Sequence, residues 1–340
     1  MTREASQLAW PVIGHEWAVR LLAQTLRHGR LSHAYLFVGP PGVGKTTLAR
    51  ALAQAMLCSQ EDPASRPCGA CRACQLVRQD RHPDVRLVAP PGPDRALSIE
   101  QIRELQREAS LSPMEGRSKV FIVRELDRAT PQAANALLKT LEEPPPHVTL
   151  LLTAVQREAL LPTVVSRCQV LALRPLSIAV VEEALRERWE VAPEQAALLA
   201  RLSGGCLGVA VAALEDEDVG ARRQQAIERM MHALEADRVT RLELAEQLSQ
   251  EPEAVREIVS LWLGWWRDVM LIQSGCDDRI VNIDQRDVLQ RAARYWAHER
   301  VREIVQGLRD TLEYMEANVN TRLALETLLL SLPYAPSRQA

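Results

Sequence analysis

The sequence predicts an α/β domain with a five-stranded parallel sheet, followed by a region built only of helices. Short apolar runs alternate with helical patterns as far as Leu173, and helices alone follow Pro175. A glycine-rich turn at residues 39–46 joins the first apolar run to a helix. With 340 residues, 47% of them hydrophobic and only 4% aromatic, the chain is long enough for two or three helix-rich domains.

The α/β part begins with a buried strand and ends before a proline. The five expected strands are residues 34–38, 84–89, 119–123, 148–153 and 170–173. A capping box at Ser98 opens one helix, and Thr130 followed by Pro131 opens another, which the prolines at 144–146 must end. Strands that alternate with helices form a parallel sheet covered on both faces, with ligands at the carboxyl ends of the strands.

The helical part divides at an acidic stretch, residues 215–218. We expect short helices at 177–189, 193–202 and 207–214, then five or six longer ones, including 255–271 and 320–332. Trp262, Trp265 and Trp266 lie at helical spacing and fill a core, or alternatively face another subunit. The predicted domains are 1–174, with a cysteine module inserted at 58–74, then 175–215 and 216–334, with a tail at 335–340.

The turn at 39–46, GPPGVGKT, has the full spacing of a phosphate-binding loop between a strand and a helix. Its backbone N–H groups converge on phosphate oxygens, Lys45 reaches the outer phosphates, and Thr46 ligates magnesium. The alternative is a glycine- and proline-rich turn with an incidental lysine. The expected nucleotide-binding residues are Gly39, Gly42, Gly44, Lys45, Thr46, Thr47 and Thr153.

The acid that such a loop needs for hydrolysis is missing. An enzyme of this kind holds magnesium partly through an Asp at the tip of a neighbouring strand. The strand at 119–123 is followed by Arg124, whose guanidinium donates hydrogen bonds and cannot coordinate a cation. We therefore expect ATP and magnesium binding with little or no hydrolysis. If the strand is misplaced by one residue, Glu125 is the ligand instead.

Four of the seven cysteines gather after the loop helix: Cys58, Cys68, Cys71 and Cys74. Four thiolates close a tetrahedral shell around zinc, and a shell without an open position is structural. An iron–sulfur cluster is an alternative, but the further cysteine followed by proline is absent; unligated thiols are another. His82 is close in sequence but is expected to be a loop residue before Pro83.

Charge and the terminal sequence exclude several function classes. The 41 basic and 44 acidic residues give a net charge of −3, so DNA binding by the overall field of this chain is not indicated. No apolar run of 18 residues exists, and residues 1–5 carry no export signal, so we expect a cytoplasmic protein without membrane contact.

Several separate segments share one resemblance: residues 33–37 before the loop, the cysteine module, ANALLKTLEEPP at 134–145, and Ser166-Arg167-Cys168. Together, from about Ile13 to Leu332, they resemble subunits of the bacterial DNA polymerase III clamp loader. That family contains gamma and tau motors and a delta-prime type that does not turn over ATP. Arg124 favours the delta-prime type, as does Gly208, which stands where motors carry a second sensing arginine.

The resemblance implies an AAA+ nucleotide domain, a small helical lid and a C-terminal helical collar. It implies a hetero-pentameric ring with gamma/tau and delta subunits that places the sliding clamp on primed DNA, as part of the polymerase holoenzyme, a nucleotidyltransferase complex. Arg167 would then act as an arginine finger in trans, completing a neighbour's ATPase site. Taken alone, Arg167 is a helix-end arginine that satisfies carbonyls. Thr153 stands where the family has its first sensor.

Two other functions are compatible with the motifs. An active gamma/tau-type motor would turn over ATP in isolation, at a rate abolished by Lys45→Ala. A small-molecule kinase or a metal-dependent regulator built on the phosphate loop would work without partners. The long helical C-terminal third gives the latter little support, so we expect no independent enzymatic activity.

Overall fold

The computed structural model describes residues 10–92, 95–250, 252–317 and 319–335. The terminal segment 1–5, on which the export argument rests, lies outside these residues, as does the predicted tail beyond residue 335. Contacts divide the chain into two compact units. The first runs to Glu190 and includes Ser203–Val209; the second consists of Val191–Leu202 and the chain from Ala210 onward. The three domain boundaries predicted above stay predictions.

The first unit is built on a parallel five-stranded sheet, as predicted. Its strands follow the order β2-β3-β4-β1-β5, and every neighbouring pair is parallel. Their bounds lie within one or two residues of those expected from the apolar runs. The strands are β1 (Ala34–Val38), β2 (Val85–Val88), β3 (Lys119–Val123), β4 (Val148–Ala154) and β5 (Gln169–Ala172).

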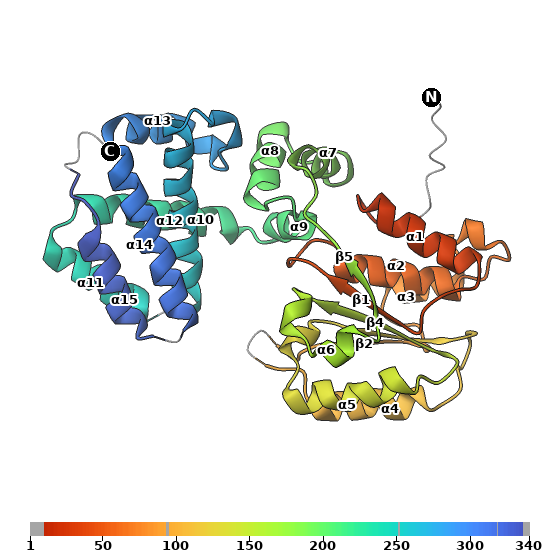
Figure 1. Cartoon of the computed structure of the whole chain (residues 1–340). Helices are drawn as coiled ribbons and strands as arrows, with labels where there is room; N and C mark the ends of the chain where they lie inside the picture. The colour runs from red at the N-terminus through yellow and green to blue at the C-terminus, as the bar shows by residue number, and fades with distance from the viewer. Residues whose placement is uncertain (1–9, 93–94, 251, 318, 336–340) are drawn as a thin grey trace. The chain divides into compact units, whose positions relative to one another are not determined.

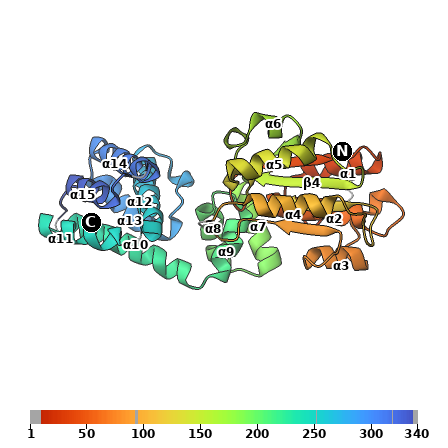
Figure 2. The ribbon, with the colours of Figure 1, turned by 90° about the horizontal axis from the view of Figure 1, so that it is seen from below.

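Helices cover both faces of the sheet, because each buried strand presents alternate side chains to opposite sides (Figure 1). Tyr35 and Phe37 of β1 belong to one core, and Leu36 of the same strand belongs to the other. The first face carries α1 (Glu16–Arg27), α2 (Lys45–Leu57) and α3 (Arg72–Arg78). The second carries α4 (Ile99–Ala109), α5 (Pro131–Glu142) and α6 (Pro162–Val165), and α4 and α5 lie side by side (Figure 2).

Local capping explains where these helices begin. The Ser98 hydroxyl accepts the N–H of Gln101, and the Gln101 side chain accepts the N–H of Ser98, which completes the predicted capping box. Thr130 caps α5 through the N–H of Ala133, with proline at the next position. Both predicted helix starts are therefore confirmed.

The strand expected from Asp84 starts one residue later, because the Asp84 side chain forms hydrogen bonds with a neighbouring loop. Its carboxylate accepts the backbone N–H groups of Met114, Glu115 and Gly116 at 2.6–2.8 Å. These hydrogen bonds oppose the effect of burial and lower the pKa of Asp84. The side chain thereby fixes the loop that leads into β3.

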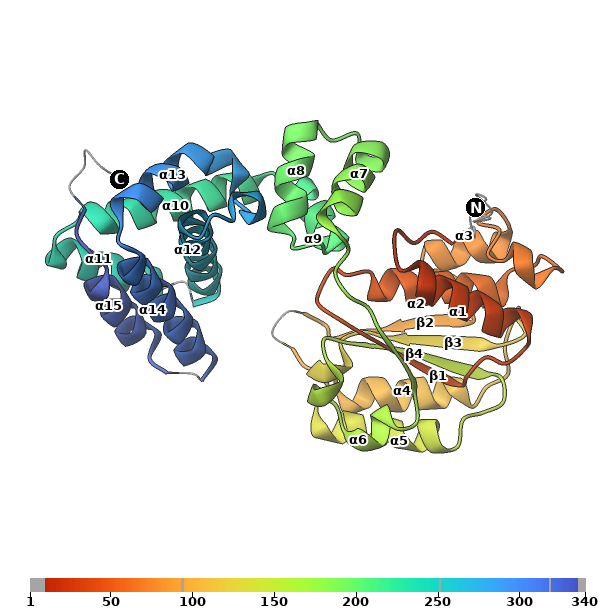
Figure 3. The same cartoon turned by 45° about the horizontal axis from the view of Figure 1, so that its top comes forward.

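Helices continue after β5, as expected. They are α7 (Ile178–Trp189), α8 (Pro193–Leu202), α9 (Leu207–Glu215), α10 (Asp218–Glu235), α11 (Arg238–Ser249), α12 (Pro252–Gln273), α13 (Arg286–Tyr295), α14 (His298–Glu316) and α15 (Thr321–Ser331). In the second unit α12 packs on α14, and α11 packs on α15 (Figure 3). Among the described residues, no helix combines the length and apolarity that crossing a membrane requires.

The tryptophans of α12 fill the core of the second unit. Trp262, Trp265 and Trp266 are at most 1% exposed, and the indole N–H of Trp262 donates to Ala226 O at 2.7 Å. Nearby Asp268 is fully buried and accepts the N–H groups of Val281 and Asn282. The predicted core role of these tryptophans is confirmed, and the alternative of an exposed interface role is wrong for this chain.

Candidate functional site

The phosphate loop connects the carboxyl end of β1 to α2, the context in which its sequence predicts anion binding. Gly42 and Gly44 have φ angles of 70° and 109°, which side chains other than glycine rarely adopt. A Cβ on Gly39, where φ is 150°, would collide with Leu173 O. The glycines therefore shape the loop, and α2 begins at Lys45 with its N-terminus at the loop.

Lys45 lies within this loop and folds over it. Its ammonium donates to Gly39 O at 2.5 Å and to Pro40 O at 2.8 Å. Burial lowers the pKa of Lys45, and the nearby negative charge of Asp127 opposes that shift. Thr46 is half-buried beside the loop, whereas Thr47 is exposed on α2. The arrangement keeps the lysine at the loop, where an anion would replace the two carbonyls.

The carboxyl end of β3 carries the arginine expected from the sequence. The strand ends at Val123 and Arg124 follows directly, so the alternative of a one-residue shift is wrong. Glu125 has a left-handed φ of 52° and accepts from Arg124 at 3.1 Å and from Arg128 at 2.6 Å. Its carboxylate is thus shared by two guanidinium groups, which compete with any cation or water for its oxygens.

Thr153 of β4 joins this edge of the sheet. It is 1% exposed, and its Oγ1 accepts the backbone N–H of Glu125 at 3.0 Å. The hydroxyl thereby ties the end of β4 to the residue after β3. Its role in nucleotide binding stays a prediction.

Sequence reasoning missed two contacts of the loop. The ring Nε2 of His15 donates to Val43 O at 2.9 Å, and His15 is 5% exposed. Gly208 N donates to Gly42 O at 2.8 Å, and a Cβ on Gly208 would lie 2.8 Å from that oxygen and 3.0 Å from Gly42 Cα. No sequence spacing links His15 to Val43. In the sequence, Gly208 indicates only that the second sensing arginine of the motors is absent.

The four cysteines of the predicted module come together. The Sγ atoms of Cys58, Cys68, Cys71 and Cys74 all lie within 4.8 Å of one another. Four Zn–S bonds of about 2.3 Å in a tetrahedron place the sulfurs about 3.8 Å apart, and the Cys58 and Cys71 sulfurs are 4.0 Å apart. The donor set and its spacing therefore fit zinc, and this cluster can hold the ion.

Backbone hydrogen bonds support the module. The N–H of Cys71 donates to the sulfur of Cys68 at 3.3 Å, and the N–H of Cys74 donates to the sulfur of Cys71 at 3.5 Å. Burial acts to raise the pKa of Cys71, but hydrogen bonds from Ser59 and Cys74 lower it to about 6. His82 is not among the residues whose ligand atoms gather in the cluster, and its Nδ1 accepts the N–H of Asp84 at 3.1 Å.

Arg167 lies at the amino ends of the strands, whereas the phosphate loop lies at their carboxyl ends. It comes two residues before Gln169, which begins β5 and pairs with Tyr35 of β1. About four residues of strand, roughly 13 Å, separate that level from Gly39. The guanidinium donates to Thr163 O at 2.9 Å and pairs with Glu142 at 2.8 Å. It therefore does act as a helix-end arginine, and it stands away from its own loop.

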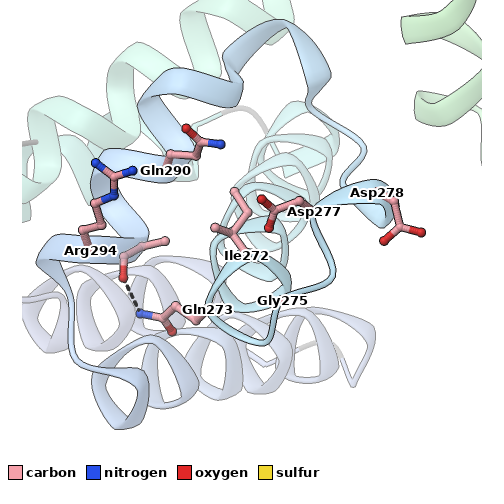
Figure 4. Close-up of a pocket in the computed structure, with 8 residues that line it drawn as sticks. Ile272, Gln273, Gly275, Asp277, Asp278, Gln290 and Arg294 are labelled. Carbon is pink, nitrogen blue, oxygen red and sulfur yellow. Dashed lines mark hydrogen bonds between the residues drawn. The ribbon is translucent and has the colours of Figure 1, made fainter.

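The second unit has an open hollow of about 620 Å³ between the end of α12, the short turn Asp277–Arg279 and α13 (Figure 4). Asp277, Asp278 and Arg294 line it with mixed charge. Gln273 in its wall has a structural role, since its amide donates to Ala293 O and to Trp296 O. We assign no function to this hollow.

Comparisons with known proteins extend over both units. Residues 14–177 match the family model for the DNA polymerase III delta subunit, and residues 218–333 match the model for its C-terminal region. DNA polymerase III subunit delta-prime of Bacillus subtilis is 31% identical, over 92% of this chain and 94% of that protein. The chain belongs to the DNA polymerase III delta-prime family.

The chain is also similar to a second delta-prime subunit, a tau subunit and a solved protein. The Pseudomonas aeruginosa delta-prime subunit is 30% identical, over 93% of this chain and 96% of that protein. The tau subunit of Escherichia coli is 31% identical over 96% of this chain, which spans about half (51%) of tau. A solved gamma-subunit-related protein of Thermotoga maritima is 19% identical over 92% of this chain and 97% of that one, with a TM-score of 0.43. This delta-prime family member is a clamp-loader subunit of DNA polymerase III.

Proposed function

We propose that this chain supplies Arg167 in trans to the ATPase site of a neighbouring gamma/tau-type subunit and hydrolyses little or no ATP itself. The observation that carries the proposal is the separation of two groups on one sheet. The phosphate loop is at the carboxyl ends of the strands, called here the carboxyl edge. Arg167 is at the amino ends, called the amino edge, so Arg167 cannot serve its own loop. A guanidinium delivered across a subunit boundary stabilises the charge that develops on the transferring phosphate.

The chain's own loop supports the second half of the proposal. It keeps the glycines and Lys45 that bind phosphate, and so supports ATP and magnesium binding. The strand tip offers Arg124 where a magnesium ligand is needed, and Glu125 is held by two arginines. Binding without turnover follows from these side chains, because the transition state lacks a metal ligand and a free carboxylate.

Membership of the family leads us to propose the partners as well. The chain would join gamma/tau and delta subunits in a hetero-pentameric ring, acting on the sliding clamp and, through the complex, on primed DNA. The C-terminal helical unit, residues 218–333, would serve as the collar that joins the subunits.

Arg167→Ala tests the proposal in the reconstituted complex. We expect ATP turnover to fall by about 10³-fold, the lower end of the range for arginine fingers, while gel filtration shows an intact assembly. Arg157→Ala is the control, since Arg157 is exposed and forms an ion pair with its neighbour Glu158. Unchanged turnover with Arg167→Ala would remove the assignment.

A gamma/tau-type motor is the second candidate, favoured by the similarity to tau and by the intact loop. It predicts that the isolated chain hydrolyses ATP at high ATP and magnesium, and that Lys45→Ala abolishes this activity. Our proposal predicts no turnover above background in either protein.

We also propose that the four cysteines hold a structural zinc ion. Cys58 directly follows α2, whereas Cys71 and Cys74 lie at the start of α3, so the ion would tie the two helices together. All four sulfurs are used, which leaves no open position for chemistry.

Cys71→Ser tests the zinc assignment. We expect metal analysis to find one zinc per wild-type chain and less in the variant, with a lower melting temperature for the variant and for protein treated with a chelator. Cys276→Ser is the matched control, because Cys276 lies outside the cluster. Metal-free wild-type protein prepared without chelators would contradict the assignment.

A further inference from the structure

Arg167 contacts three acceptors of its own chain. Its Nη1 donates to Thr163 O at 2.9 Å and more weakly to the hydroxyl of Ser166 at 3.4 Å. Its Nη2 forms an ion pair with Oε1 of Glu142 at 2.8 Å. Because Thr163 O and Glu142 contact different nitrogens, they restrict the orientation of the guanidinium as well as its position.

Nε and Nη2 of this guanidinium keep N–H groups for another molecule. Both hydrogen bonds of the side chain come from Nη1, and the contact of Nη2 with Glu142 is an ion pair. In the part of the chain that the structure describes, neither Nε nor Nη2 donates a hydrogen bond. The Arg167 side chain is 35% exposed, so these donors can reach an anion outside the chain.

Glu142 itself has no evident structural need for this pair. It ends α5, its side chain is 49% exposed, and exposed ion pairs add little to stability. The two partners come from motifs that are 25 residues apart in the chain, and the fold brings them together at the amino edge of the sheet.

We propose that Glu142 is a positioning residue for Arg167. Its carboxylate holds the guanidinium in the orientation that presents the N–H groups of Nε and Nη2 to the phosphate of a neighbouring subunit. This inference rests on the proposed function of Arg167. Without the acceptor, the long arginine side chain samples other rotamers, and a misplaced catalytic group lowers the rate without changing substrate affinity.

The test is steady-state ATP turnover by the complex reconstituted with gamma/tau and delta subunits, sliding clamp and primed DNA. Glu142→Ala removes the acceptor, and Glu142→Gln keeps a hydrogen-bonding oxygen without the charge. We expect the alanine variant to lower kcat on the order of tenfold with an unchanged KM for ATP. The glutamine variant should lie between the alanine variant and wild type, and the adjacent exposed residue gives the control, Glu143→Ala, which should equal wild type.

A double variant shows whether Glu142 acts through Arg167. Glu142→Ala added to Arg167→Ala should cause no further loss, because the group it positions is already gone. Wild-type or raised turnover in Glu142→Ala, a glutamine variant no better than the alanine variant, or a further loss in the double variant overturns the inference. If Arg167→Ala leaves turnover unchanged, the proposed function of Arg167 fails as well. If Arg167→Ala lowers turnover and only the Glu142 variants behave otherwise than expected, the inference about Glu142 fails alone.

Discussion

The two edges of the sheet hold their charges in opposite ways. At the carboxyl edge, Lys45 donates to carbonyls of its own loop, and Glu125 is shared between two arginines. At the amino edge, Arg167 contacts Glu142 and Thr163, and within the described residues its Nε and Nη2 donate no hydrogen bond. The charges of the first edge are paired within the chain, whereas the second edge carries a guanidinium that is partly exposed to solvent.

This difference is the basis of the proposal that the chain retains a nucleotide loop and completes the ATPase site of a neighbouring subunit. Hydrolysis needs a metal ligand and a water-orienting group at the carboxyl edge, and these are the positions where the chain has an arginine and a paired glutamate. An arginine finger needs only an exposed, oriented guanidinium, which makes no demand on the loop.

The largest effect that separates the edges is expected from Lys45→Ala. It should weaken ATP binding to the isolated chain by roughly a hundredfold, because a charge-assisted contact to phosphate is lost. Turnover by the reconstituted complex should stay within about twofold of wild type. Equilibrium binding and steady-state turnover measure the two. Lys139→Ala, at an exposed position, is the control. If Lys45→Ala lowered turnover by the complex as much as Arg167→Ala does, the two edges would not differ in function.

A smaller effect is expected from Gly208→Ala. Alanine favours a helix over glycine by about 1 kcal/mol, but here its Cβ would lie 2.8 Å from the backbone oxygen of Gly42, which cannot move freely. Overpacking typically costs about 1–3 kcal/mol, so we expect net destabilisation in urea unfolding. Gly220→Ala has no atom within 4 Å of its new Cβ and should stabilise α10 instead. Stabilisation by Gly208→Ala would show that the contact with the loop is loose.

The smallest effect is expected from Glu125→Gln. The pairs with Arg124 and Arg128 are partly exposed, so their loss should lower the free energy of unfolding by less than about 1 kcal/mol. ATP turnover by the isolated chain should stay at background. Glu158→Gln, which breaks the exposed pair with Arg157, is the control for loss of one surface charge. If the isolated chain hydrolysed ATP and Glu125→Gln abolished that activity, the carboxyl edge would be an active ATPase site, contrary to our proposal.

The sequence was sufficient for the features that depend on local spacing. Alternation of apolar runs identified the five strands, and the capping residues Ser98 and Thr130 marked helix starts. The cysteine spacing identified a module whose sulfurs do converge. Arg124 at the tip of β3 also followed from the sequence alone, because a strand end and its next residue are local properties.

Contacts between distant segments required the tertiary structure. The pairing of Glu142 with Arg167, the hydrogen bond from His15 to Val43, and the approach of Gly208 to Gly42 each join residues that no periodicity connects. The order of the strands decided which helix ends meet at each edge of the sheet. Local spacing thus determined which groups this protein carries, and chain topology decided which of them neutralise one another and which point outward.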